Sequence, residues 1–344
     1  MGLPTRWELS DGRLLELQRL GPRGRPIFYL TNNVGAADTV STDELWPGGA
    51  TGLEIDGSGL VIGEWDGGAV YAGHPDFGGR VSQPDGATSV SAHATHVAGT
   101  LVASGDGLQP EARGMAYAAF LDAYDWNGDM AEMAAAASGG LLVSNHSYGI
   151  AAGWLYLGEP EPDNWWWIGG SAPSDVEDWN FGYYDEISQA WDQIAYDAPH
   201  YLIVKAAGND RSDVGPAPDE EYTVIDQEGN FLFTSTLPRN PDCYPDGYDC
   251  LPTHSVAKNI LTVGAVDDVP GGYSPLTGPS AVQMTPFSAW GPTDDGRIKP
   301  DVVGNGLFLM STWPEYPYYA AAAGTSMASP SIAGSLRSEE HTSE

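Results

Sequence analysis

The sequence of 344 residues is poor in cationic side chains. Lysine and arginine together number 14 against 47 aspartates and glutamates, which gives a formal net charge of −33. The lysines are only Lys205, Lys258 and Lys299. So acidic a chain repels phosphates, which argues against nucleic acid as a partner. The charge indicates a protein kept soluble in salt or one that binds cations, and a merely well-solvated surface explains it equally well.

Cysteine is scarce too, with Cys243 and Cys250 as its two occurrences. Pro245 and the pair 246–247 between them are turn-forming residues, so this short loop can close on itself. We expect a disulfide and therefore an oxidising compartment, with two free thiols as the alternative. A four-ligand zinc site lacks the second cysteine pair that would complete it.

Long apolar runs are absent as well. No stretch of about 18 apolar residues occurs, so we expect no membrane span. The first eight residues contain no apolar signal-peptide segment, and the true start of a secreted protein would lie upstream. Residues 337–344 break sharply from the apolar pattern before them and resemble a translated sequencing adapter. We therefore expect a non-native tail there and a fragment at both ends.

The sequence does have the composition of a globular protein, with 42% hydrophobic residues. It is long enough to form one large α/β domain or two smaller ones. Apolar strand-like runs alternate with segments of helical periodicity, and this alternation predicts a mostly parallel central sheet with helices on both faces. The aromatic and acidic insertion at 150–182 is expected to pack over the domain edge. The predicted strands cover 59–68, 118–124, 140–149, 201–210 and 259–266, and the predicted helices cover 41–46, 91–103, 128–137, 183–196 and 329–336.

Four polar residues stand at predicted strand ends and helix starts, where α/β proteins keep their sites. They are Asp66, His93, Asn209 and Ser326. Each has an ordinary alternative, since Asp66 can cap a turn and Ser326 can cap a helix. Together they supply what acyl transfer needs: a hydroxyl, an imidazole to take its proton, a carboxylate to orient the imidazole, and an amide donor for the oxyanion.

His93 and His96 stand three residues apart on one predicted helix, a spacing that invites a metal hypothesis. The pair lacks the glutamate and the i, i+4 spacing of the zinc-protease helix. We therefore expect His96 to be a packed, hydrogen-bonded histidine rather than a ligand.

The order acid, histidine, amide, serine, with its flanking residues, resembles the subtilisin-like serine protease family (subtilase, peptidase family S8). The matching motifs are residues 61–68, 93–100, 206–209 and 324–330, and the resemblance covers residues 55–336. Ala94 stands where the family usually has glycine, and Ser331 where it often has histidine. Neither departure removes a catalytic group.

The resemblance implies a serine endopeptidase that works through an acyl-enzyme. It makes Asp66, His93 and Ser326 a catalytic triad and places the amide of Asn209 in the oxyanion hole. It also makes the segment Ser147, Tyr148 and Gly149 the strand that pairs with the substrate backbone, beside a wall of small residues. That wall consists of Ala206, Ala207 and Gly208.

The same resemblance implies a subtilisin-like three-layer α/β fold, with residues 41–336 as the catalytic domain. Residues 1–40 are then an N-terminal extension, the tail of a propeptide. We expect a secreted monomer that acts on protein or peptide substrates. The chemistry needs no cofactor, and structural calcium would suit the acidic chain, although no stretch identifies its ligands.

Two other functions were weighed against this one. An inactive module on the same fold would hold peptides along 147–149 without cutting them. An esterase or lipase would carry a Gly-x-Ser-x-Gly elbow, which the sequence lacks. For the peptidase, Tyr148 and the small wall at 206–208 predict an apolar or aromatic residue before the cut, whereas the acidic surface would favour basic substrates.

Overall fold

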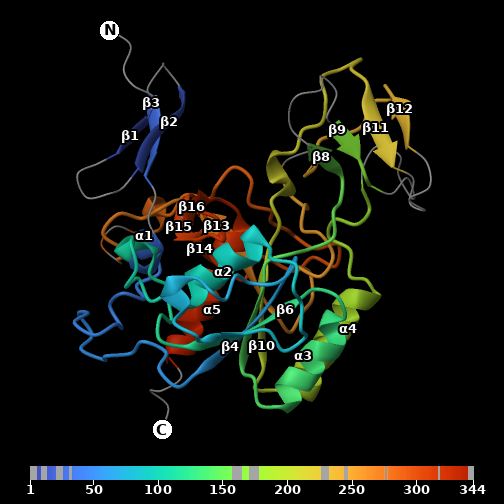
Figure 1. Cartoon of the computed structure of the whole chain (residues 1–344). Helices are drawn as coiled ribbons and strands as arrows, with labels where there is room; N and C mark the ends of the chain where they lie inside the picture. The colour runs from blue at the N-terminus through green and yellow to red at the C-terminus, as the bar shows by residue number, and fades with distance from the viewer. Residues whose placement is uncertain are drawn as a thin grey trace.

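The computed structural model describes residues 6–8, 14–20, 26–30, 33–156, 165–169, 178–225, 232–243, 247–274, 276, 278–316 and 318–339. Its centre is a seven-stranded sheet in the order β14-β13-β10-β7-β4-β6-β5 (Figure 1). Every neighbouring pair in this sheet is parallel, as the alternation of strands and helices predicts. The strands are β4 (Val61–Asp66), β5 (Val81–Ser82), β6 (Phe120–Asp125), β7 (Val143–His146), β10 (Leu202–Ala206), β13 (Leu261–Val266) and β14 (Val302–Asn305).

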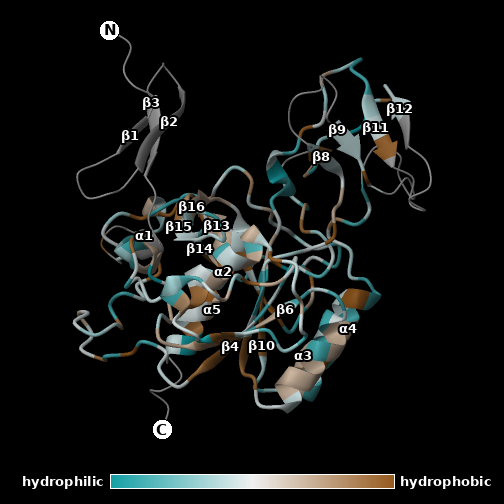
Figure 2. Ribbon diagram, viewed as in Figure 1, coloured by the Kyte–Doolittle hydropathy of each residue, from teal (hydrophilic) through white to brown (hydrophobic). Residues whose placement is uncertain are grey.

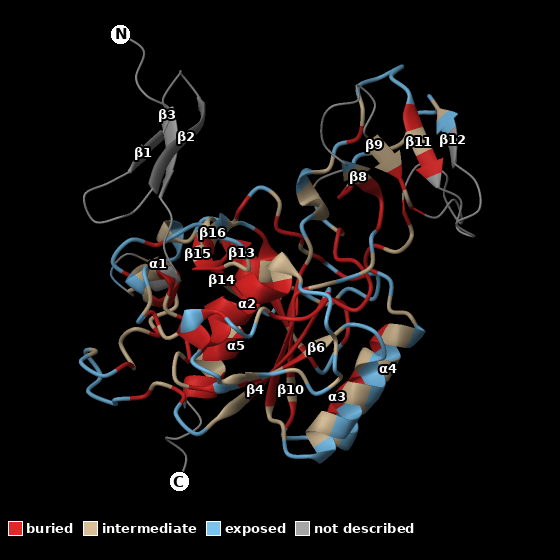
Figure 3. Cartoon of the chain, viewed as in Figure 1, coloured by how far each residue is buried: buried red, intermediate tan, exposed pale blue. Residues whose placement is uncertain are grey.

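Two helices, α2 (Ala92–Val102) and α5 (Thr325–Glu339), cover one face of the sheet. Both are largely buried, as the red ribbon of Figure 3 shows. Small residues in α2 let it pack closely, and a Cβ built on Gly99 would overlap atoms of the β15 strand beneath it. The main hydrophobic core therefore lies between these helices and the sheet.

The opposite face is covered by α3 (Asp129–Ser138) and α4 (Glu186–Asp197). Helix α4 is amphipathic, since it buries Trp191 and exposes polar residues such as Gln189, whereas the alanine-rich α3 buries Met133 and exposes Met130 (Figures 2 and 3). Trp65 and Ile203 from the strands meet Met133 and Trp191 from the helices in a second core. Helices on both faces confirm the predicted three-layer α/β architecture.

A separate four-stranded sheet, in the order β12-β11-β9-β8, lies apart from the central sheet in Figure 1. It joins the aromatic insertion to the loop-rich segment after β10, two stretches that the sequence pattern did not connect. Trp154, Trp167 and Tyr222 form its small core. The strands are β8 (Trp154–Tyr156), β9 (Trp165–Trp167), β11 (Tyr222–Ile225) and β12 (Leu232–Ser235).

The remaining elements lie before β4, in the connections between the strands of the central sheet, or between β14 and α5. They are β1 (Arg6–Glu8), β2 (Leu14–Leu20), β3 (Pro26–Leu30), α1 (Asn33–Thr39), β15 (Leu309–Thr312), β16 (Tyr319–Ala322) and four short 3₁₀ turns, η2 (Pro75–Phe77), η3 (Pro110–Ala112), η4 (Asp210–Ser212) and η5 (Pro279–Ala281). Within the described parts of the chain, no helix is both long and apolar enough to cross a bilayer.

The predicted helix at 41–46 is wrong. That stretch forms successive turns with bonds such as Leu45 N–H to Thr42 O, while the helix of this region is α1. Pro47 and Gly48 follow too closely for an i→i+4 ladder to continue. The Trp46 indole is instead held by the carbonyl oxygen of Met115 at 2.9 Å.

The last helix is longer than the sequence pattern suggests. It begins at Thr325, so Ser326 lies in its first turn, and it continues to Glu339. The Arg337 guanidinium donates to Val61 O at 3.1 Å, and Ser338 is fully buried. These residues therefore pack on the domain, while 340–344, the rest of the predicted tail, lie outside the described residues.

Candidate active site

Asp66 and His93 are in direct contact. Asp66 is the last residue of β4 and is 2% exposed, and His93 lies in the first turn of α2. Ser91 caps this turn by accepting from Ala94 N–H at 3.1 Å, which fixes where the helix starts. The Nδ1 atom of His93 lies 2.7 and 2.9 Å from the two carboxylate oxygens of Asp66.

Burial and the neighbouring Asp66 shift the pKa of His93 in opposite directions. Partial burial lowers the pKa, but the hydrogen bond and the negative charge of Asp66 raise it, and the balance is a raised pKa. The side chain remains 43% exposed, so its other nitrogen is open to a reactant. The imidazole of His93 can accept a proton only above this raised pKa.

Glu64 is a buried acid that the sequence analysis did not single out. It is 0% exposed, and neither of its carboxyl oxygens has a hydrogen-bond partner among the described residues. Burial, and after it the negative charge of Asp66, raise the pKa of Glu64 well above the ordinary value, which favours its neutral form. The alternation of a strand was the available signal, because residues two apart share one face.

Ser326 is held at the start of α5. Gly324, immediately before the helix, has φ +154°, a conformation that suits glycine, and Thr325 N–H donates to Asn209 Oδ1 at 2.9 Å. The Ser326 hydroxyl donates to Ser147 O at 3.0 Å, and among the described residues it forms no hydrogen bond with His93. Rotation about one side-chain bond is enough to redirect a serine hydroxyl.

Asn209 presents the donor end of its amide. Its Oδ1 accepts from both the N–H and the hydroxyl of Thr325, at 2.9 and 3.1 Å, and these donors assign the orientation of the amide. The Nδ2 group has no partner among the described residues, and Asn209 is exposed. Together with the Ser326 N–H in the first turn of α5, it can donate to a developing negative charge.

The two predicted substrate segments follow neighbouring strands, Ser147–Tyr148–Gly149 after β7 and Ala206–Ala207–Gly208 at the end of β10. The Ser147 hydroxyl donates to Ser326 O at 2.9 Å, which ties the first segment to α5. The Tyr148 hydroxyl donates to Asp129 Oδ2 at 2.6 Å, so this ring is anchored on α3. The fold thus brings all the sequence-predicted site residues except the cysteines to one edge of the sheet.

His96 is fully buried, as expected of a packed histidine. Its Nε2 lies 2.9 Å from Leu309 O and 3.1 Å from Ala320 O, far from a shared ligand position with His93. Burial lowers the pKa of His96 to about 4, so it is neutral. The metal hypothesis for this pair is therefore not supported.

Cys243 and Cys250 are joined in a disulfide, with their Cα atoms 4.7 Å apart. Both are buried in a small cluster with Ala207 and Leu251. The bond therefore lies beneath the wall at 206–208 and closes the loop that the sequence predicts.

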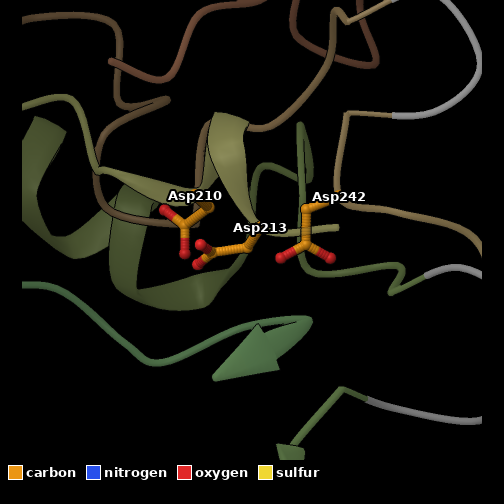
Figure 4. Close-up of side chains that lie close together, drawn as sticks. All are labelled: Asp210, Asp213 and Asp242. Atoms are coloured by element: carbon orange, nitrogen blue, oxygen red, sulfur yellow. The ribbon is translucent and has the colours of Figure 1, made fainter. Parts of the chain in front are cut away.

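A group of three carboxylates lies beside Asn209 (Figure 4). Oxygens of Asp210, Asp213 and Asp242 all lie within 4.8 Å of one another. Burial raises the pKa of Asp210 to about 7, of Asp213 to about 6 and of Asp242 to about 10, because these groups are poorly hydrated. Carboxylate oxygens are the ligands that calcium prefers, so these are the described residues that could hold such an ion.

A parallel α/β sheet with a carboxylate, an imidazole, an amide and a helix-start serine at one edge defines the class of subtilisin-like serine peptidases. The sequence comparison gives the same class, because the family model of the subtilase family, peptidase S8, matches residues 57–337. The chain belongs to the subtilase family.

Two solved structures show the same fold. The Clostridium perfringens CspB protease is 15% identical with a TM-score of 0.56, and the similarity covers 90% of this chain and 86% of that one. Sphericase is 23% identical with a TM-score of 0.51, covering 84% and 80% of the two chains. At these identities the similarity concerns the fold alone.

Two curated relatives match shorter stretches. An uncharacterised Aquifex aeolicus protein, aq_aa18, is 31% identical over 132 residues, 35% of this chain and 52% of that protein. C5a peptidase of Streptococcus pyogenes serotype M3 is 42% identical over 78 residues, 23% of this chain and 6% of that protein. The match thus spans about half of the first relative and a small part of the second.

The contact with Asp66 leads to a prediction for the titration of His93. In the intact protein, NMR titration is expected to give His93 a pKa above the ordinary histidine value. Asp66→Asn removes the charge, so burial then dominates and the pKa falls. His96, with its pKa of about 4, serves as the internal control and is expected to keep it. A His93 pKa that is the same in both proteins would contradict this account.

Proposed function

We propose that this protein is a serine endopeptidase that cleaves peptide bonds through an acyl-enzyme on Ser326. The observation that carries the proposal is the contact of 2.7 Å between His93 and Asp66, at the same sheet edge as Ser326 and Asn209. A carboxylate that holds one imidazole nitrogen leaves the other as the proton acceptor. The exposed side of His93 is where that acceptor is available.

In this mechanism the Ser326 hydroxyl leaves Ser147 O and transfers its proton to Nε2 of His93 as Oγ attacks the carbonyl carbon. The carbonyl oxygen becomes an oxyanion that accepts from Asn209 Nδ2 and from the Ser326 N–H. His93 then gives the proton to the leaving amine, and the C–N bond breaks. Water, deprotonated by His93, attacks the acyl carbon and releases the carboxylic acid and Ser326.

The substrate backbone would pair with Ser147–Tyr148–Gly149 as an added strand, in which main-chain hydrogen bonds hold the peptide. This segment is already fixed relative to the nucleophile. Asn145 donates to the Ser147 hydroxyl at 3.0 Å and accepts from Ser329 of α5 at 2.6 Å. A peptide bound along the segment is therefore positioned against Ser326 without further ordering of the protein.

The compartment, the oligomeric state and the domain boundaries belong to the same proposal. The protein acts on proteins or peptides as a secreted monomer, and the disulfide between Cys243 and Cys250 suits an oxidising compartment. Residues 41–336 form the catalytic domain and 1–40 an extension that is the tail of a propeptide. An inactive peptide-binding module is the competing function, and the complete set of reacting groups favours the enzyme.

Covalent labelling tests the nucleophile directly. A fluorophosphonate probe is expected to label the protein and to leave Ser326→Ala unlabelled, because only an activated hydroxyl attacks the probe. Ser280→Ala, at an exposed serine far along the chain from the site, is the matched control and keeps the label. A folded, unlabelled wild-type protein would favour the binding module.

Asn209→Ala tests the amide donor. We expect kcat on a peptide substrate to fall about 10²–10³-fold, the loss known for the equivalent donor in subtilisin, with KM little changed because the oxyanion exists only in the transition state. The labelled fraction of each preparation corrects for unfolded protein. A kcat within a few-fold of wild type would remove Asn209 from the proposed oxyanion hole.

Calcium is the one ion that we include in the proposal, with a structural role. The chemistry itself needs none, since the side chains supply every reacting group, and the oxygen ligands of Asp210, Asp213 and Asp242 fit calcium chemically. The thermal unfolding midpoint is expected to be higher in excess calcium than in EDTA, because binding to the folded state stabilises it. Identical midpoints with calcium and EDTA would rule this role out.

A further inference from the structure

Lys205 is a buried cation directly beneath the two substrate segments. It lies one residue before the end of β10, pairs in register with His146 of β7, and is 1% exposed. Its ammonium donates to Ala206 O at 2.9 Å, which uses one of its three hydrogens. Among the described residues no carboxylate forms an ion pair with it. A buried charge without a counter-ion is costly, so this one calls for an explanation.

The ammonium faces both segments. A Cβ built on Gly149 would lie 3.7 Å from Lys205 Nζ, with no other neighbouring heavy atom within 4 Å. On the other segment, Ala206 O accepts the hydrogen bond from the same ammonium. The ring of Tyr148 lies 5.9 Å from it. Lys205 Nζ is therefore close to both Gly149 and Ala206, and in the proposed peptidase the side chain before the scissile bond would lie between these two segments.

Further unpartnered polar groups lie in the turn that packs against the second segment. A Cβ on Gly208 would lie 2.9 Å from Pro252, and Ser255 donates to Ala206 O at 3.0 Å. Between these two residues, Thr253 Oγ1 and both ring nitrogens of His254 are buried and have no hydrogen-bond partner. Buried polar atoms without partners are rare in folded proteins, and a bound polar group would satisfy them.

We propose that Lys205 selects an acidic residue, glutamate above all, immediately before the scissile bond. The glutamate carboxylate would accept from Lys205 Nζ, with Thr253 and His254 as further donors. This inference rests on the proposed peptidase function and replaces the apolar or aromatic preference that the small wall suggests. A lysine side chain at this place would be repelled, and a leucine would leave the ammonium unpaired and further from water.

The electrostatic surroundings of Lys205 support this choice. Burial lowers the pKa of Lys205 to about 7, although the charges of Asp210 and Asp66 raise it in part. The facing imidazoles of His146 and His254 both have lowered pKa values, first through burial and then through the charge of Lys205, so they are neutral donors. A substrate carboxylate beside the ammonium would raise the pKa of Lys205 and keep it protonated. By the same linkage, the protonated form of Lys205 would bind the carboxylate more tightly.

The net charge of −33 does not cancel this preference. Repulsion between an acidic peptide and distant surface carboxylates is screened by salt within about 10 Å at 0.1 M, whereas a buried contact is screened far less. The surface thus affects how fast an acidic peptide arrives, and Lys205 affects which side chain is held.

The test is a set of peptides that differ only at the residue before the cut, with glutamate, glutamine, leucine, phenylalanine or lysine there. Glutamate and glutamine have the same shape, so their ratio of kcat/KM isolates the charge. We expect the wild type to prefer glutamate over glutamine by about tenfold or more, and over leucine. Lys205→Met is expected to lose the glutamate preference, so that its ratio of kcat/KM for the glutamate and glutamine peptides falls toward one.

Lys258→Met is the matched control. Lys258 is a half-exposed lysine whose ammonium lies 4.3 Å from the centre of the Tyr184 ring, outside the two substrate segments, so the glutamate preference is expected to persist. A wild-type enzyme that cleaves the leucine or phenylalanine peptide best would overturn the proposal. So would a Lys205→Met variant that retains the wild-type glutamate-to-glutamine ratio.

If Lys205→Met does not fold, the wild-type ratio alone decides, and equal cleavage of the glutamate and glutamine peptides overturns the proposal. Fluorophosphonate labelling of the same wild-type preparation distinguishes a failure of the Lys205 proposal from a failure of the proposed peptidase function. Labelled enzyme without a glutamate preference refutes the role of Lys205 and leaves the peptidase intact. Folded protein that is neither labelled nor active refutes the peptidase, and the role of Lys205 with it.

Discussion

The site depends on the first turn of α5 being fastened to the ends of two strands. Asn209 after β10 accepts both donors of Thr325, and Ser147 after β7 donates to the carbonyl oxygen of Ser326. These bonds hold Ser326, the amide of Asn209 and the segment that follows β7 in one frame. Because all of them are short-range contacts between rigid elements, the proposed peptidase would need little further ordering to bind a peptide.

Two ionisable side chains near this frame, Glu64 and Lys205, are almost completely buried. Glu64 is buried next to Asp66, and Lys205 is buried below the substrate segments. Desolvation favours the neutral form of both groups, so it raises the pKa of Glu64 and lowers the pKa of Lys205 to about 7. Both groups lie close to the candidate site, because Glu64 is two residues before Asp66 on β4 and Lys205 Nζ is 5.9 Å from the ring of Tyr148.

Most of the central sheet was predictable, because its strands are apolar runs that end in polar residues and its helices keep their periodicity. The small sheet was not, since β9 pairs with β11 across more than fifty positions of sequence. The turns at 41–46 were misjudged because a capping pattern says nothing of the contacts that hold Trp46 to Met115. The candidate site residues were predicted from their order and motifs. Glu64 shares a strand face with Asp66, which was a local signal, whereas Lys205 and the aspartates beside Asn209 carry none.

The sequence by itself determined which chemical groups are available, in which order, and on which kind of element, because motif spacing and periodicity are local properties. Only the tertiary structure decided that the Ser326 hydroxyl bonds to Ser147 O, that His96 is buried against Leu309 O, and that no carboxylate of the described residues forms an ion pair with Lys205. Those facts depend on strand order and packing between distant segments. Burial and distance, which set the pKa values and the hydrogen bonds, exist only once the chain has folded.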